Sequence, residues 1–143
     1  MIVSKEPGKK SFTLKEGDRL VFRELLDGGE TEIEITHEGR SSSDVVIGAV
    51  LDGKPYKAKA VLRMLKGAEG SEGSIKLRAL LLSDTPVIQE PWLDIRTGNV
   101  KAAHSASIER LDHEKLFYLM SRGISDAENE LVEAFKRSVI EGQ

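Results

Sequence analysis

The sequence contains no cysteine, and this absence excludes disulfides and every function that depends on a thiolate. It also lacks a long apolar run, because no segment approaches the roughly 20 residues that a membrane-spanning helix needs. Residues 1–7 carry neither the basic block nor the apolar block of a signal peptide. We therefore expect a cytoplasmic protein with no membrane segment.

An excess of basic residues is missing too. Lysine and arginine total 21 against 24 aspartate and glutamate residues, so the net charge is -3, and binding to a nucleic acid backbone is not expected. Three histidines without cysteine leave few ways to build a transition-metal site. The length of 143 residues predicts a single domain spanning residues 1–143, with an ordinary hydrophobic content of 39%.

Short segments of alternating polarity, separated by glycine, aspartate and proline, follow one another through residues 1–111. In one segment Ile33, Ile35 and His37 share a face. A second segment places its apolar residues on one face in the same way: Tyr56, Ala58, Ala60, Leu62 and Met64. Strands that recur without intervening helices are typical of a sandwich, a barrel or a β-helix.

An internal echo favours the β-helix among these three folds. Gly53, Gly73 and Gly98 each precede a strand in which apolar and basic residues alternate. Similar strands stacked on one another are what a β-helix requires, because each turn of the coil covers only its neighbours.

The spacing becomes helical in residues 112–143, which we predict to be a two-helix subdomain. Asp112 is placed to cap the first helix and Gly123 to end it in a left-handed conformation. Ser125 and Glu128 have the spacing of a capping box that opens the second helix.

The second helix carries an apolar stripe at four-residue steps, formed by Ala127, Leu131, Phe135 and Val139. Two interpretations stay open for this stripe. It covers either the end of the chain's own sheets, as local core, or the surface of a partner.

Motifs for chemistry are mostly absent. The glycine-rich segment 67–73 lies between strands and lacks the features of a phosphate-binding loop, and no Gly-x-Ser-x-Gly sequence occurs. Two His-Glu pairs occur, at residues 37–38 and 113–114, but adjacent residues of a strand point to opposite faces, and the second pair opens a helix. We predict no metal site at either pair.

His104 lies on a strand face with Ala102 and Ala106. We interpret it as a hydrogen-bonded core histidine, with a functional ligand as the alternative. Six basic residues would form either a solvated face or a basic stripe if their strands stack: Lys57, Lys59, Arg63, Lys76, Arg78 and Lys101.

Segments 102–108 and 116–124, which read Ala-Ala-His-Ser-Ala-Ser-Ile and Leu-Phe-Tyr-Leu-Met-Ser-Arg-Gly-Ile, resemble the carboxy-terminal signature of the SufB/SufD family. Segments 78–83 and 91–95 are similar to the strands that precede this signature. Together the resemblance covers about residues 40–143.

This resemblance implies a mainly β fold: a short right-handed β-helix of stacked flat strands with a carboxy-terminal two-helix subdomain. Members of the family are non-enzymatic subunits of the iron-sulfur cluster assembly machinery. They pair through the β-helix and dock an ABC-type ATPase, SufC, through the carboxy-terminal region. On this basis we expect a SufC-like ATPase as one partner and a SufB-like chain, or a second copy, as the other. The residues expected to contact partners are Phe117, Tyr118, Arg122, Gly123, Leu131, Phe135 and Val139.

The sequence also departs from the family. Members are usually longer, and this chain begins near the middle of their β-helix, so the resemblance implies a short form. SufD-like chains often read Cys-Ser-His where this sequence reads Ala102-Ala103-His104, and Ser105 replaces an acidic residue of SufB-like chains. The chain thus resembles a SufD-type partner, with no resident cofactor. His104 would at most contact a transient iron-sulfur cluster shared with a partner chain.

Two other functions remain open from the residues alone. One is a small-molecule or sugar-binding β module with His37 and His104 inside it. The other is an enzyme that uses His104 as a base, for which no nucleophile or acid can be named.

Overall fold

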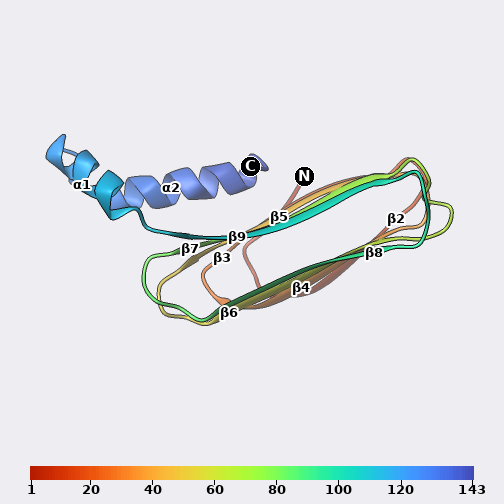
Figure 1. Ribbon diagram of the computed structural model, residues 1–143, viewed down its shortest axis with the longest axis horizontal. Coiled ribbons are helices and arrows are strands. Elements are labelled where there is room, and N and C mark those ends of the chain that lie inside the picture. The colour runs from red at the N-terminus through yellow and green to blue at the C-terminus, as the bar shows by residue number, and fades with distance from the viewer.

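The alternating segments of the sequence form nine strands that coil into a flattened β-helix, followed by two helices (Figure 1). The computed structural model describes residues 1–143. The strands are β1 (Ile2–Ser4), β2 (Gly8–Leu14), β3 (Arg19–Leu26), β4 (Gly29–His37), β5 (Ser42–Leu51), β6 (Tyr56–Met64), β7 (Glu72–Leu81), β8 (Val87–Ile95) and β9 (Lys101–Arg110). The helices are α1 (His113–Ser121) and α2 (Ala127–Ile140). No helix is long and apolar enough to span a membrane.

Consecutive strands belong to different sheets. Sheet A has the order β1-β3-β5-β7-β9, sheet B has the order β2-β4-β6-β8, and every pairing is parallel. Each strand therefore pairs with the strands two places before and after it, and the chain alternates between the two layers seen in Figure 1. Two consecutive strands make one turn of the coil, which we call a rung. The β-helix predicted from the sequence is confirmed.

The core lies between the two sheets and is filled by alternate residues of β2 to β7. Ile33 and Ile35 face inward, as predicted, and so do the apolar residues of β6 from Tyr56 to Met64. Small inward side chains hold the layers close together, and all of them are fully buried: Ala49, Ala58, Ala60 and Ala79. The alternation of the sequence thus identifies the inner faces correctly.

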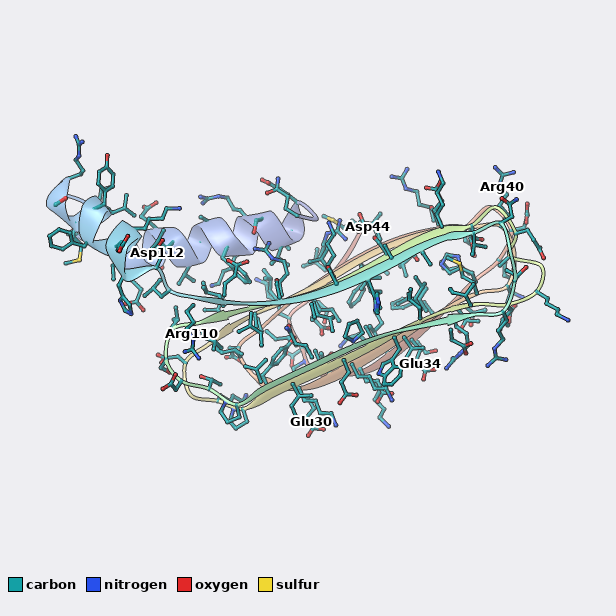
Figure 2. All side chains as sticks on the ribbon, viewed as in Figure 1. Glu30, Glu34, Arg40, Asp44, Arg110 and Asp112 are labelled. Carbon is teal, nitrogen blue, oxygen red and sulfur yellow. The ribbon has the colours of Figure 1, made fainter.

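On the outer face of sheet B, acidic and basic residues of neighbouring strands lie side by side, so no stripe of basic residues forms. In register across the rungs, Lys59 lies between Glu32 and Glu90. Arg63 pairs with Glu34 at 3.6 Å and with Asp94 at 3.0 Å. Figure 2 shows Glu30 and Glu34 pointing away from the interior. Of the two alternatives for the basic residues, sheet B thus shows the solvated face and not the basic stripe, because acidic residues from neighbouring rungs separate the basic ones.

Helix α2 lies against the outer face of sheet A (Figure 1). Phe135 and Val139 form a small buried cluster with Val46 of β5 and Leu80 of β7. Sheet A is thus covered by its own chain at this point, which agrees with the local-core interpretation of these two residues.

The helix ends follow the sequence prediction in part. Asp112 caps α1 through its carboxylate, which accepts a hydrogen bond from the Lys115 N–H at 3.0 Å. Gly123 follows α1 with φ of 86°, the left-handed conformation that was predicted. The capping box at Ser125 is wrong: α2 begins at Ala127, and its N-cap residue Asp126 makes no side-chain capping bond.

Candidate functional site

The last rung, formed by β8 and β9, leaves the coil open at one end. β9 pairs only with β7, and β8 pairs only with β6. We call this pair of strands the terminal rung. An unpaired strand edge exposes N–H and C=O groups that another chain can pair with.

The hydrogen bonds show which groups of β9 are free. Lys101 N–H donates to the Ser71 carbonyl at 3.0 Å, and Leu111 N–H donates to the Leu81 carbonyl at 3.1 Å. Alternate residues of a parallel ladder bond to the same neighbour. The odd-numbered residues of β9 therefore face β7, and the even-numbered residues from Ala102 to Arg110 direct their backbone groups to the open edge.

The two edges differ in how well they are protected. The Arg96 N–H donates to the Met64 carbonyl at 2.8 Å, so the even-numbered residues of β8 bond to β6. The odd-numbered residues face the open side, and among them Pro91 has no N–H to donate. Glu90 and Asp94 add charge to this strand. The middle of β9, residues 102–107, is uncharged and small except for His104. The open edge of β9 is thus the better template for pairing.

His104 lies on this open edge. His104 is paired in register with Ile75 of β7, whose side chain is in the core, so the His104 side chain belongs to the inner face. No further rung covers it, and the residue is exposed. Its Nδ1 lies 3.3 Å from the Pro91 carbonyl oxygen across the interior. The favoured interpretation of a buried core histidine is therefore wrong, since parity reports the face and not whether that face is covered.

Helix α1 has no buried residue and exposes several apolar side chains. Phe117 is 74% exposed, Met120 57% and Tyr118 54%. Arg122 lies over the Tyr118 ring, 5.2 Å from its centroid, and Gly123 ends the helix. These positions include four of the residues for which the resemblance implies partner contacts, and they leave an unpartnered apolar surface.

The other expected partner residues lie on α2 and are arranged differently. Phe135 and Val139 are buried against sheet A, and Leu131 is half-buried. Phe135 and Val139 are thus occupied within the chain and do not offer a free surface. An apolar stripe cannot report its target, which is why the sequence left both alternatives open.

His37 is enclosed in the coil rather than in a ligand cavity. Its Nδ1 lies 2.7 Å from the Ser41 hydroxyl and its Nε2 lies 2.9 Å from the Ser43 hydroxyl. Burial lowers the pKa of His37, which favours the neutral ring. His104 is exposed on the uncovered inner face of the terminal rung, and both ring nitrogens of His37 are engaged, so the two histidines do not share an enclosed ligand cavity.

A second buried polar group escaped the sequence analysis. Glu24 of β3 is fully buried, with one carboxylate oxygen 2.8 Å from Lys10 Nζ and the other accepting a bond of 2.6 Å from Thr31. Tyr56 lies nearby, and its burial together with the Glu24 charge raises the pKa of the phenol. The only signal was a charged residue at an inward position of an apolar strand.

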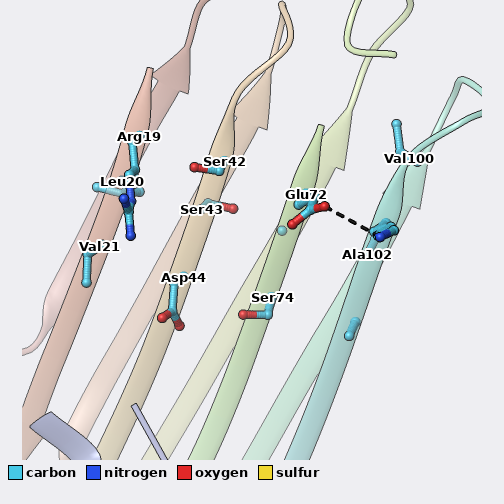
Figure 3. Close-up of a pocket in the computed structure, with 13 residues that line it drawn as sticks. Arg19, Leu20, Val21, Ser42, Ser43, Asp44, Glu72, Ser74, Val100 and Ala102 are labelled. Carbon is cyan, nitrogen blue, oxygen red and sulfur yellow. Dashed lines mark ion pairs between the residues drawn. The ribbon is translucent and has the colours of Figure 1, made fainter. Parts of the chain in front are cut away.

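One broad hollow crosses sheet A at the starts of its strands (Figure 3). It is lined by small and charged side chains, among them Arg19, Asp44 and Ser74, and a pair between Glu72 and Lys101 at 3.7 Å crosses it. No group of three or more histidine, cysteine, aspartate or glutamate residues is placed to hold a metal ion. The hollow therefore offers no defined set of convergent ligands.

Comparison with known proteins gives one family. Residues 28–135 match the family described as SUF system FeS cluster assembly, SufBD core domain. An iron-sulfur cluster assembly SufBD family protein of Archaeoglobus fulgidus is 36% identical over 121 residues, 82% of this chain and 32% of that protein. A SufBD family protein of Mycobacterium tuberculosis is 36% identical over 94 residues, 62% of this chain and 11% of that protein.

The iron-sulfur cluster assembly protein SufB of Bacillus subtilis is 26% identical over 98 residues, 66% of this chain and 21% of that protein. This chain thus spans a third or less of the length of these relatives. The matched segment runs from the end of β3 through the terminal rung and α1 into α2. The chain belongs to the SufBD core domain family.

Proposed function

We propose that this chain is a non-enzymatic subunit of an iron-sulfur cluster assembly complex. It pairs with a SufB-like chain or with a second copy through the terminal rung, and it docks a SufC-like ABC-type ATPase through its helices. The observation that carries the proposal is the placement of two unsatisfied surfaces, the open β9 edge and the exposed face of α1, on adjacent segments of one family domain.

Support for pairing comes from the terminal rung. The even-numbered residues of β9 present free backbone groups over the length of the strand, and one of them, Ile108, is 53% exposed. A strand from a partner would bond to these backbone groups and cover the side chains of His104 and Ile108 on the inner face of β9.

Support for docking comes from α1. Phe117, Tyr118 and Met120 are each more than half exposed, and no residue of the helix is buried. A helix that presents apolar residues at close spacing fits a hydrophobic groove on another protein. We assign the dock to α1 rather than to Phe135 and Val139, because α2 uses those two residues against sheet A.

The cluster enters this proposal as cargo. His104 is the one imidazole on the pairing edge, and its only polar contact is the Pro91 carbonyl. A single imidazole cannot hold a cluster, so thiolates or other ligands must come from the partner chain. The same isolation supports a role other than catalysis, because a general base needs an oriented partner group.

The test is co-purification of the full chain with the SufC-like ATPase and the SufB-like protein of the same organism, with complex size measured by light scattering. In the variant Phe117→Asp/Met120→Asp we expect loss of the ATPase but not of the SufB-like chain. Both side chains are exposed, so circular dichroism should remain native.

The control is Trp92→Asp, which places a negative charge at another exposed aromatic, on the outer face of β8. We expect this variant to retain the ATPase. Absence of any complex with the unmodified chain would refute the proposal, and equal loss in both variants would refute the assignment of the dock to α1.

A further inference from the structure

A groove separates α2 from β9 on the outer side of sheet A. It is lined by residues of β7, β9, the β9–α1 connection and α2. Helix α2 therefore rests on β3, β5 and β7 but does not lie directly on the edge strand. Arg78 of β7 lies in this groove and reaches both sides of it.

The guanidinium of Arg78 divides its contacts between the two elements. Toward α2, Nη1 donates to the Ser138 hydroxyl at 2.7 Å and to the Gln143 backbone oxygen at 3.1 Å, and the group lies 4.7 Å from the centroid of the Phe135 ring. Toward β9, Nη2 donates to the Glu109 carboxylate at 2.9 Å. The Arg78 side chain is 17% exposed, so these contacts are partly shielded from water.

Other side chains hold α2 in place without touching β9. Lys76 donates to the Gly142 carbonyl at 3.0 Å, and Arg23 donates to the Ile140 carbonyl at 3.1 Å. Neither of them bonds to an edge-strand side chain. Apart from the covalent connection through residues 111–126, which includes α1, Arg78 is thus the one polar bridge between α2 and β9.

The chemistry of this bridge requires arginine. A guanidinium is planar and presents donors in fixed directions, so one side chain can bind two partners in a defined relative orientation. The ion pair with Glu109 orients the plane, and the orientation of the plane decides whether Nη1 meets Ser138. A change at β9 therefore alters the contact at α2, and the reverse holds as well.

We propose that Arg78 is a positioning residue that couples the packing of α2 on sheet A to the conformational order of β9. By linkage, a partner that engages the β9 edge then changes the affinity for a partner on the helices, and by the same factor in the other direction. This inference deepens the proposed function, because it connects the pairing edge with the docking helices. Its test needs neither partner.

The experiment measures amide hydrogen exchange of the full chain, resolved to α2 and to β9. Glu109 makes no hydrogen bond or ion pair with α2, yet we expect Glu109→Gln to speed exchange in α2 about two- to fivefold, the effect of losing one partly exposed ion pair. In the Arg78→Met background the same change should have no effect on α2. Reciprocally, Ser138→Ala should speed exchange of the β9 amides that bond to β7.

Arg110→Gln is the matched control. Arg110 lies on β9, the strand of Glu109, and forms an ion pair of 2.9 Å with Asp84 that does not involve Arg78. Because Arg110→Gln breaks only this pair, amide exchange in α2 should stay unchanged. Arg78→Lys keeps the charge but lacks the fork, so it should fold and yet lose the response of α2 to Glu109→Gln. If Arg78→Met does not fold, Arg78→Lys takes its place as the background in which the effect of Glu109→Gln on α2 is measured.

Two results would overturn the coupling. One is an α2 exchange rate that Glu109→Gln does not change. The other is an equal change with and without Arg78, which additive structural roles would produce. Because no partner is added, a failure here leaves pairing and docking standing, and a failure of complex formation leaves the coupling standing.

Discussion

Val139 of α2 occupies the space that a side chain at Gly48 of β5 would fill. A Cβ placed on Gly48 would lie 2.5 Å from Val139 Cγ2, which is closer than real contacts allow. Gly48 lies in the middle of a strand, where glycine weakens local structure. Its presence there is explained by the close approach of the helix, so the outer face of sheet A is shaped to receive α2.

We predict that Gly48→Ala destabilises the seat of α2 by about 1–3 kcal/mol, the usual cost of overpacking. Chemical denaturation should report the loss, and hydrogen exchange should localise it to α2. Gly98→Ala is the matched control, since nothing lies within 4 Å of a Cβ at that position. Equal stability of the two variants would contradict the fit between Gly48 and Val139.

A second prediction concerns acid. Burial lowers the pKa of His37, so below the unfolded value of about 6.5 the unfolded chain binds more protons than the folded one. The stabilisation is complete above about pH 6.5 and is lost as the pH falls toward the lowered folded value. Urea denaturation at about pH 7.5 and about pH 5 should show this loss in the wild type, and a smaller loss in His37→Gln. Identical pH profiles for the two proteins would rule out His37 as the cause.

The buried pair of Lys10 and Glu24 gives a third prediction. Lys10→Met leaves the Glu24 carboxylate buried without its counter-charge, which costs about 3 kcal/mol, at the lower end for a broken buried pair because the Lys10 side chain is 22% exposed. The double variant Lys10→Met/Glu24→Leu should recover most of this stability in urea denaturation. Tyr56→Phe is the control, because the Tyr56 hydroxyl has no hydrogen-bond partner and its removal should be nearly neutral. A double variant as unstable as Lys10→Met alone would show that the buried charge is not the source of the cost.

The open edge of β9 gives a fourth prediction, which depends on the proposed pairing. Ala106→Pro removes an N–H that faces the edge, so the fold should persist while association with a SufB-like chain or a second copy is lost. Ser107→Pro removes an N–H that faces β7, so it should lower the free energy of unfolding instead. Light scattering and thermal denaturation distinguish these effects. Association that survives Ala106→Pro unchanged would exclude this edge as the pairing surface.

The inner faces of the strands were predictable because side chains alternate strictly in a strand. Ile33, Ile35 and Leu62 face inward for this reason. The partners across the rungs were not predictable in the same way. Lys59 meets Glu32 and Glu90 only because turns of different lengths bring those residues into register, and alternation within one strand does not contain that information.

The candidate site was predictable to a similar extent. The family resemblance indicated α1 and His104, while the exposure of His104 depends on the absence of a covering rung, which no local pattern reports. The target of the α2 stripe depends on Gly48, a residue that is distant in sequence from Val139. Glu24 was missed because an inward carboxylate is stabilised only by Lys10 and Thr31 from other strands.

The column Lys9, Glu32, Lys59 and Glu90 on sheet B changes sign at every rung. Removal of the strand of Glu32 alone would set two lysines side by side, removal of the strand of Lys59 alone would set two glutamates side by side, and like charges facing one another destabilise a sheet. Removal of two successive rungs would restore the alternation. Along this column, rungs can therefore be lost from the interior of the coil without bringing like charges together only when two successive rungs are lost at once.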